Sequence, residues 1–479
     1  MSGHELTEMS ARALAHGIRT GHFSSEEVVA AHLARIADVN GAVNAVVSLR
    51  ADEALATARE RDAEVRAGRI RGPLHGVPTA VKDLMDVAGM PTSQGSRVHA
   101  GRIAEADSVI VGHLRVAGAI FVGKTNTPEF GAGSHTFNDV FGVTRNPYDL
   151  TRSAGGSSGG AAAAVTSGML PFADASDLGG SIRNPASFGN LVGLRPTAGR
   201  VASARPGNAW DPASVLGVLT RDVEDTALLM SVISGPEKRA PLAVDEDPAL
   251  FRSLRPRSFD GVRIAYSPDL GGLPLDPQVR AATEAAARRL TELGAEVEIV
   301  DIDLSEADLV FETFRSLEFL DGHGEDVRLH PDLVKKTVRD DVAWAADFGA
   351  DLIVRAAAAR TRLFRRFQEL MDRYALLLAP AVQVLPFPVE WEYPTAIDGV
   401  TMERYYTWQR SCSRITATAM PAMSLPAAFS AEGLPIGVQL VGGYRGEREM
   451  LEFALTWEGA VAEVMRRRPD LAQPASQAV

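Results

Sequence analysis

Short apolar runs alternate with helical patterns along much of this chain, and this alternation constrains its fold more than any other feature. The run VPTAVK at 77–82 is followed by a helical pattern at 106–118 and then by a second run, AIFVGKTN at 119–126. Strand, helix and strand in this order are typical of parallel strands joined by crossover helices, so the pattern predicts an α/β protein. The length of 479 residues leaves the number of domains open.

The same alternation continues in both directions from these runs. At the N-terminus, residues 1–20 read as one amphipathic helix, and Ser24 with Glu27 forms a capping box before the next helix. The stretch 235–248 is a candidate linker. The remaining predicted helices are 52–66, 161–169, 221–234, 278–293, much of 305–375, and 447–464, and the remaining strands are 170–177, 262–267, 295–303, 375–381 and 434–441.

Composition excludes several classes of function. Hydrophobic residues make up 46% of the chain and charged residues 23%, as in a globular protein with a large core. The formal net charge of -12 disfavours binding to nucleic acid or to an anionic membrane. The apolar stretch Ala161 to Pro171 is too short to span a bilayer, for which about 20 residues are needed. The single cysteine, Cys412, excludes an internal disulfide, and the start of the chain lacks the apolar core of a signal peptide, so we expect a cytoplasmic protein.

Three local features point to nucleophilic chemistry. Ser157 and Ser158 lie in a glycine-rich run directly before an alanine-rich helix, whose N-terminus presents free N–H groups. Ser181 follows Leu178, Gly179 and Gly180 in a turn after an apolar segment, where successive N–H groups can stabilise an oxyanion. Lys82 ends an apolar strand, and burial there would favour the neutral amine, which can act as a base.

Together these features resemble the amidase signature family. Residues 72–82 resemble its lysine strand, 123–134 and 141–150 the segment leading into the signature, and 155–196 the signature itself, while 424–442 extends the likeness towards the C-terminus. The resemblance implies a single large domain, 1–479, with a central mixed, mostly parallel sheet flanked by helices on both faces. Within it we expect an N-terminal helical scaffold (1–70), the signature core (71–235), an inserted α/β and helical segment (236–375) and a C-terminal return to the core sheet (376–479).

The resemblance also implies roles for individual residues. Ser181 matches the nucleophile, Ser157 the bridging serine reached through a cis Gly156–Ser157 peptide bond, and Lys82 the base. Leu178, Gly179, Gly180 and Ser181 match the oxyanion hole. Supporting roles fall to Gly156, to Ser158 through a hydrogen bond to Lys82 or Ser157, and to Asp177 and Arg183, which are expected to hold the nucleophile turn in shape.

A few positions depart from the family pattern. Ala175 and Ser176 replace a frequent Gly-Thr and Leu178 replaces a frequent Thr, and we expect none of them to contact the triad. The stretch 201–217 lacks the Tyr-Gly-Leu and Ser-Ser-Leu-Asp-Gln pattern that is typical of the glutamine-hydrolysing subunit of transfer-RNA amidotransferases. That glutamine-hydrolysing enzyme is therefore the second interpretation.

Other enzyme classes fit less well. GGSSGG also satisfies G-x-S-x-G, the nucleophile elbow of α/β-hydrolase esterases, but the preceding segment 146–154 is polar and contains proline, so we expect no strand there. No S-x-x-K motif supports a penicillin-binding or β-lactamase class. The ten histidines form no H-E-x-x-H, and neither a metal nor a cofactor is implied. A non-enzymatic scaffold would require loss of a triad residue, and all three are present.

The substrate class stays open at this stage. The expected partner is a small amide or carbamate, with urethane cleavage included, and a homodimer is compatible with the sequence. Loop-like segments carry aromatic residues that are candidates for lining a pocket, with ordinary packing as the alternative for each. They are Phe130, Phe137, Trp210, Trp391, Tyr393, Tyr405, Tyr406 and Trp408.

Overall fold

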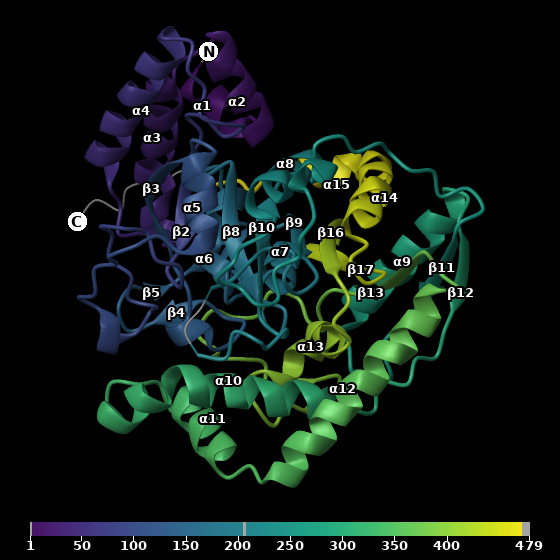
Figure 1. The fold of residues 1–479 in the computed structure, drawn as a ribbon. Coiled ribbons are helices and arrows are strands. Elements are labelled where there is room, and N and C mark those ends of the chain that lie inside the picture. Colours follow the sequence, from purple (N-terminus) through teal and green to yellow (C-terminus); the bar gives the residue numbers. More distant parts are fainter. Residues whose placement is uncertain (1, 205–206, 472–479) are drawn as a thin grey trace.

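Helices cover both faces of a large mixed sheet in the computed structural model, which describes residues 2–204 and 207–471 (Figure 1). Met1, in the first predicted helix, and residues 205–206, in the stretch 201–217, lie outside the described residues. The α/β class, the mixed sheet and the single domain are confirmed. No helix in the described part of the chain is long and apolar enough to cross a membrane.

Eight strands form the large sheet. Its order is β12 (Glu296–Ile299), β11 (Arg263–Tyr266), β13 (Leu376–Pro380), β17 (Pro435–Gly442), β16 (Ala422–Phe429), β9 (Val192–Arg195), β10 (Val215–Thr220) and β8 (Phe172–Asp177). Signature strands and C-terminal strands therefore share one sheet, with β16 hydrogen-bonded to β9.

The expectation of a mostly parallel sheet is wrong. Strand β11 runs parallel to β12 and β13, but the other five neighbouring pairs of the large sheet are antiparallel. One reason is the short turn between β16 and β17, closed by the Gly433 N–H to the Ser430 carbonyl, because a short turn can join only antiparallel strands. Another is β10, which the pattern of apolar runs did not identify and which lies antiparallel between β8 and β9.

A second, three-stranded sheet lies beside β8. Its order is β1 (Val46–Val47), β3 (Ile120–Thr125) and β2 (Pro78–Lys82), and β2 and β3 are parallel with helix α5 (Val109–Val116) between them in the chain. The predicted crossover unit is thus confirmed here. The Thr79 hydroxyl donates to the Phe172 carbonyl at 3.1 Å, which joins β2 to β8 and so brings Lys82 to the end of β8.

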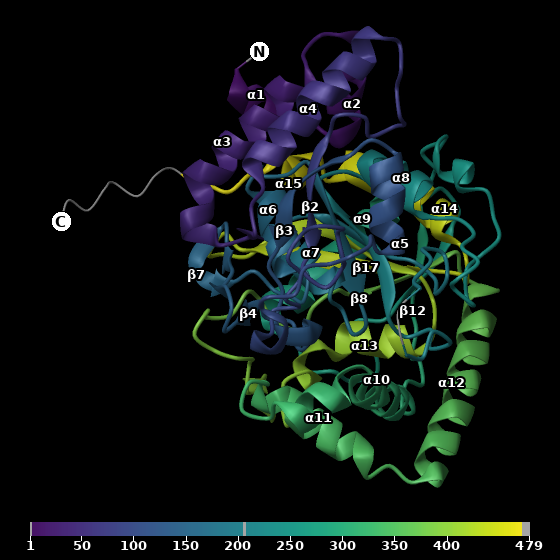
Figure 2. The same cartoon turned by 60° about the vertical axis from the view of Figure 1, so that its left-hand side comes forward.

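The N-terminal helices cap one end of the molecule and a helical segment covers the opposite end, as both views show (Figures 1 and 2). The predicted first helix is two helices, α1 (Gly3–Glu8) and α2 (Ala11–Thr20), because Ser10 caps the second and Asp225 accepts the N–H groups of Ala11 and Arg12. The capping box of Ser24 and Glu27 at α3 (Ser25–Val43) is confirmed. The predicted helical region 305–375 contains α10 (Ala307–Leu329), α11 (Lys336–Ala346) and α12 (Ala350–Met371).

The remaining helices fill the space around the sheets. They are α3 (Ser25–Val43), α4 (Ala51–Arg66), α6 (Gly159–Thr166), α7 (Arg183–Phe188), α8 (Val223–Ile233), α9 (Pro277–Glu292), α13 (Arg410–Ala417), α14 (Glu447–Ala460) and α15 (Ala462–Arg466).

Short two-stranded hairpins complete the fold. They are β4 (Phe137–Asn138) with β5 (Gly142–Val143), β6 (Arg145–Asn146) with β7 (Asp149–Ser153), and β14 (Ala396–Ile397) with β15 (Val400–Thr401). Strand β7 corrects the expectation that no strand precedes the glycine-serine run. It pairs with β6, makes an isolated bridge from Arg152 to Pro388, and lies outside the large sheet.

Helix α6 packs too tightly to tolerate a side chain at Gly160, which gives a first prediction. A Cβ there would lie 2.3 Å from the Asn126 amide nitrogen and 2.8 Å from the Ala45 carbonyl oxygen, both backbone atoms that cannot move aside cheaply. We expect Gly160→Ala to lower the free energy of unfolding by about 1–3 kcal/mol. Chemical denaturation measures this, with Gly112→Ala on α5 as the matched control. Apart from its chain neighbours and the backbone of α5, no described atom lies within 4 Å of that Cβ, so Gly112→Ala should leave stability equal or higher by up to about 1 kcal/mol.

Candidate active site

The Lys82 amine is enclosed by three serine hydroxyls. Lys82 is the last residue of β2 and its side chain is fully buried. Its Nζ lies 2.8 Å from Ser157 Oγ, 2.8 Å from Ser158 Oγ and 2.9 Å from Ser176 Oγ. A protonated amine donates three hydrogen bonds, whereas a neutral amine donates two and accepts one. The cluster therefore suits a lysine that exchanges a proton with one of its hydroxyl neighbours.

Burial makes the neutral form of this lysine accessible. Desolvation lowers the pKa of Lys82 from its ordinary value of 10.5 to about 7, and the negative charges of Asp174 and Asp177 oppose that shift only in part. Near neutral pH a substantial fraction of the amine is thus uncharged and able to accept a proton.

Ser157 lies in a segment held by neighbouring side chains. The Gly156–Ser157 peptide bond is cis, as the family resemblance implies. Ser134 donates to the Gly156 carbonyl at 2.6 Å, Thr127 to the Ser157 carbonyl at 3.0 Å and Thr136 to the Gly155 carbonyl at 2.9 Å. These side chains fix the direction of the Ser157 hydroxyl towards Lys82.

Ser181 lies in the turn between β8 and α7 and is half-buried. Its carbonyl accepts the Ser158 N–H at 3.2 Å, which ties the two serine-bearing segments together. A cavity of about 760 Å³ is lined by Ser157, Ser176 and Ser181. The structure thus brings both predicted catalytic serines to one cavity.

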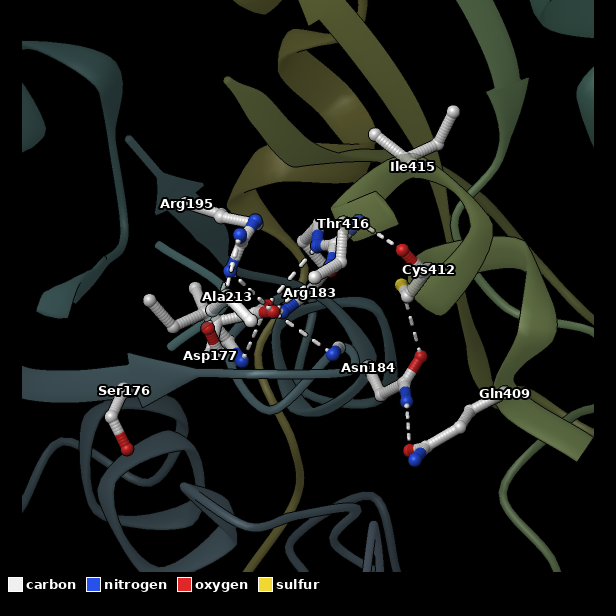
Figure 3. Close-up of polar contacts among 12 residues, drawn as sticks. Ser176, Asp177, Arg183, Asn184, Arg195, Ala213, Gln409, Cys412, Ile415 and Thr416 are labelled. Carbon is white, nitrogen blue, oxygen red and sulfur yellow. Dashed lines mark hydrogen bonds and ion pairs between the residues drawn. The ribbon is translucent and has the colours of Figure 1, made fainter. Parts of the chain in front are cut away.

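Asp177 organises the turn that carries Ser181 (Figure 3). Its carboxylate accepts the N–H groups of Gly180 at 2.9 Å and Ile182 at 3.1 Å, and it pairs with Arg183 at 2.9 Å and Arg195 at 3.3 Å. Burial alone would raise the pKa of Asp177, but the two guanidinium groups outweigh it and hold the pKa well below its usual range. The predicted pairing of Asp177 with Arg183 is confirmed.

Gly180 allows this turn to pack closely. It adopts φ +124°, and a Cβ would lie 2.7 Å from the Cys412 Cβ. Its N–H, which the resemblance places in the oxyanion hole, instead donates to Asp177. The N–H groups of Leu178, Gly179 and Ser181 donate to no other described residue, so they remain available to a bound oxygen.

Sequence reasoning missed two residues beside Lys82. The expectation that Ser176 makes no contact with the triad is wrong, because its hydroxyl is one of the three around Nζ. Asp174 Oδ1 accepts the Lys82 backbone N–H at 2.9 Å. The signal was present in the strand alternation, since residues 174 and 176 lie on one face of β8, the face turned towards β2. Ser158, predicted as a supporting residue, does contact Lys82.

The far wall of the cavity comes from helix α10 and the loops facing it. Of the eight aromatic candidates, Phe130 lines the cavity, together with Phe319 and His323 of α10, which were not predicted. The His323 ring stacks on Phe130 at 4.0 Å between centroids, and His99 hydrogen-bonds Asp326 of α10 at 3.1 Å.

The other aromatic candidates do not line this cavity. Tyr405, Tyr406 and Trp408 are buried against other rings, Phe137 and Tyr393 are partly buried, and Trp210 and Trp391 are mostly exposed.

No group of three or more His, Cys, Asp or Glu side chains that could hold a metal ion occurs among residues 2–204 and 207–471. The positions that touch the Lys82 amine are hydroxyls, which are poor ligands for a metal centre. The chemistry that this site can perform by itself is proton transfer between an amine and serine hydroxyls.

A family model described as amidase matches residues 27–451, which is most of the chain. This chain belongs to the amidase signature family. The match is incompatible with the α/β-hydrolase interpretation of GGSSGG. Amidase signature enzymes hydrolyse carbon–nitrogen bonds of amides, and this protein is an amidohydrolase of that family.

Three relatives illustrate the range of the family. A glutamyl-tRNA(Gln) amidotransferase subunit of Symbiobacterium thermophilum is 34% identical over 492 residues, covering 97% of this chain and 99% of that protein. An acylamidase of Rhodococcus erythropolis is 32% identical over 466 residues, covering 96% of both. The crystal structure of a bacterial aryl acylamidase of the amidase signature family matches with a TM-score of 0.89 at 28% identity, covering 95% of this chain and 97% of that one.

The Asp177 cluster of this amidase signature protein gives a second prediction. Asp177→Asn removes the charge that compensates buried Arg183 and Arg195, so we expect the free energy of unfolding at pH 7 to fall by about 3 kcal/mol or more. Urea denaturation checks this. The matched control is Asp107→Asn, which removes one partner of a half-exposed pair with Arg115 and should cost about 1 kcal/mol or less. Equal losses for the two variants would contradict the role given to Asp177.

The same cluster has a defined pH dependence. Because the pKa of Asp177 is depressed, its contribution to the free energy of unfolding should be fully present near neutral pH and be lost only in strong acid.

Proposed function

We propose that this protein cleaves aryl or acyl amides, and carbamates of similar shape, through an acyl-enzyme on Ser181, with Ser157 and Lys82 as the proton relay. The observation that carries the proposal is the fully buried Lys82 amine in contact with the Ser157 hydroxyl, at a cavity that Ser181 also lines.

The reaction begins with proton transfer along this relay. Neutral Lys82 accepts a proton from Ser157 while Ser157 accepts the proton of Ser181, and the Ser181 oxygen attacks the substrate carbonyl carbon. The carbonyl oxygen then becomes negatively charged. The N–H groups of Leu178, Gly179 and Ser181 are placed to stabilise that charge.

Breaking the carbon–nitrogen bond requires a proton on the leaving nitrogen. Ser157 supplies it and recovers a proton from Lys82, so the base that activated the nucleophile becomes the source of the acid. Water then enters, loses a proton along the same path and releases the acid product from Ser181. Without that proton the nitrogen would leave as an amide anion, a much poorer leaving group than an alkoxide, so the relay matters more for amides than for esters.

The cavity and the relatives support a substrate with an apolar ring or chain. Phe130, Phe319 and His323 offer aromatic surface within about 760 Å³, a volume typical of small-molecule sites. The similarity to the acylamidase and to the aryl acylamidase agrees with such substrates.

Glutamine hydrolysis within an amidotransferase complex is the second candidate. It is favoured by 34% identity to the glutamyl-tRNA(Gln) amidotransferase relative over nearly the whole chain. A substrate panel of p-nitroanilides, fatty amides, aryl carbamates and glutamine separates the two. Turnover of glutamine alone would overturn the aryl or acyl assignment.

Substitution of the proposed nucleophile gives the third prediction. We expect Ser181→Ala to lower kcat/KM for the best amide of the panel by about 10⁴-fold or more, because the proposed acyl-enzyme forms on the Ser181 hydroxyl. Lys82→Ala should also remove most amide hydrolysis and harm amides more than the corresponding esters. The matched control is Ser231→Ala on α8, whose hydroxyl bonds the Leu228 carbonyl and no other described residue, and whose loss should leave kcat/KM near the wild-type value. Full amide turnover by Ser181→Ala would refute the mechanism.

The lowered pKa of Lys82 gives the fourth prediction. Below about pH 7 the amine is protonated and cannot accept the serine proton, so kcat/KM should rise with pH through about 7 and then level off. A lysine with its ordinary pKa would place this rise in kcat/KM, the acid limb of the pH profile, above pH 10. Initial rates on a neutral amide from pH 5 to 9 measure the acid limb. A flat profile across this range would contradict a titrating Lys82.

A further inference from the structure

Asp174 is a buried carboxylate that the proposed relay does not use. It is the third residue of β8 and is only 1% exposed. Burying a carboxylate so far from solvent costs free energy unless hydrogen bonds and an opposite charge compensate it.

The contacts of Asp174 are unusual in being incomplete. Oδ1 accepts the Lys82 backbone N–H at 2.9 Å. Oδ2 is buried and has no hydrogen-bond partner among the described residues. Strands β2 and β8 belong to different sheets, so this contact and the hydroxyl bond from Thr79 to Phe172 are side-chain links that hold the end of β2 against β8.

The direction of the Asp174 side chain places its charge near the Lys82 amine. Residues 174 and 176 lie on the same face of β8, and Ser176 Oγ is 2.9 Å from Lys82 Nζ. Asp174 therefore binds the backbone of Lys82 while its neighbour on that face binds the amine.

We propose that Asp174 is a positioning residue for the catalytic lysine: its carboxylate fixes the backbone of Lys82 at the end of β2, and its negative charge sets how readily the buried amine gives up its proton. This inference rests on the proposed function, in which Lys82 is the base.

The other charged groups around this point largely compensate one another. Asp177, at the end of β8, is paired with Arg183 of α7 and Arg195 of β9. Asp83 lies 3.8 Å from Lys124 of β3, both of them buried. Neither the sequence of α6 nor that of β10 contains a titratable residue. Of these three carboxylates, Asp174 is thus the one that forms no ion pair with a described residue.

The shifts in pKa agree with this arrangement. Burial raises the pKa of Asp174 to about 6, and the Lys82 N–H and the charges of Lys124 and Lys82 restrain the rise, so the carboxylate is ionised at neutral pH. Burial lowers the pKa of Lys82, and Asp174 is the stronger of the two charges that oppose this. Removing the carboxylate charge should therefore lower the pKa of Lys82 further, because the protonated amine loses a favourable partner.

Asp174→Asn tests this with little change of shape, since the amide oxygen can still accept the Lys82 N–H. We expect the acid limb of kcat/KM to move to lower pH by about one unit. The matched control is Asp83→Asn, which removes a buried carboxylate directly next to Lys82 in the chain that instead faces Lys124, and it should leave the limb in place. A merely structural role for Asp174 would lower activity by the same factor at every pH. An unmoved limb in Asp174→Asn, or an equal shift in Asp83→Asn, would overturn the proposal.

A second variant and a second measurement guard against poor folding. Asp174→Ser also removes the charge, and the pH dependence of Ser181 labelling by a fluorophosphonate reports the ionisation of the base without amide turnover. The same downward shift is expected. If both variants fail to fold while Asp83→Asn folds, Asp174 is structural only and the proposal is wrong.

Failure of the proposed function would look different. If wild type and Ser181→Ala label equally, Ser181 is not the nucleophile, and the relay itself is wrong. If wild-type labelling depends on Ser181 and shows an acid limb that Asp174→Asn leaves unmoved, the relay stands and only the role of Asp174 is lost.

Discussion

The site depends on one interaction, the burial of the Lys82 amine among three hydroxyls at the end of β2. Protein interior replaces water around the amine, and this makes the uncharged form accessible near pH 7. The rest of the active-site structure serves to exclude water from the Lys82 amine and to hold the amine in position. Strand β2 must lie against β8, and the segment around Ser157 must also contact the amine.

A second constraint joins segments that are far apart in the sequence. Arg183 pairs with Asp177 and also donates to the Cys412 carbonyl at 3.0 Å (Figure 3). It donates as well to Gln439 Oε1 at 2.6 Å. The turn that carries Ser181 is therefore anchored to α13 and β17 of the C-terminal part of the chain. This explains why the likeness to the family near residues 424–442 accompanies the signature: β16 and β17 form the support on which the signature turn rests.

Much of the fold was predictable from local patterns. Apolar runs and helical periodicity located most elements, including β2, β8 and the helices of 305–375. Lys82, Ser157, Ser158 and Ser181 were singled out because glycine-serine runs and a strand-ending lysine have specific chemical meaning. Strand direction was not predictable in this way, because it depends on which strands become neighbours: β10 enters between β8 and β9. Ser176 and Asp174 were missed because their importance comes from the neighbouring strand. The aromatic residues could not be ranked, since burial against other rings and exposure to a cavity give the same local sequence. The division into four segments stays a prediction.

Helix α10 contributes a wall of the cavity that lies apart from the proposed catalytic residues. Phe319 and His323 face the same space as Ser181, yet they lie more than a hundred residues further along the chain and outside the elements that hold Lys82. Substitutions in this helix can therefore change the shape of the cavity while the proposed catalytic residues stay in place. A fold arranged in this way allows the substrate to change between relatives without a change in the proposed catalytic residues.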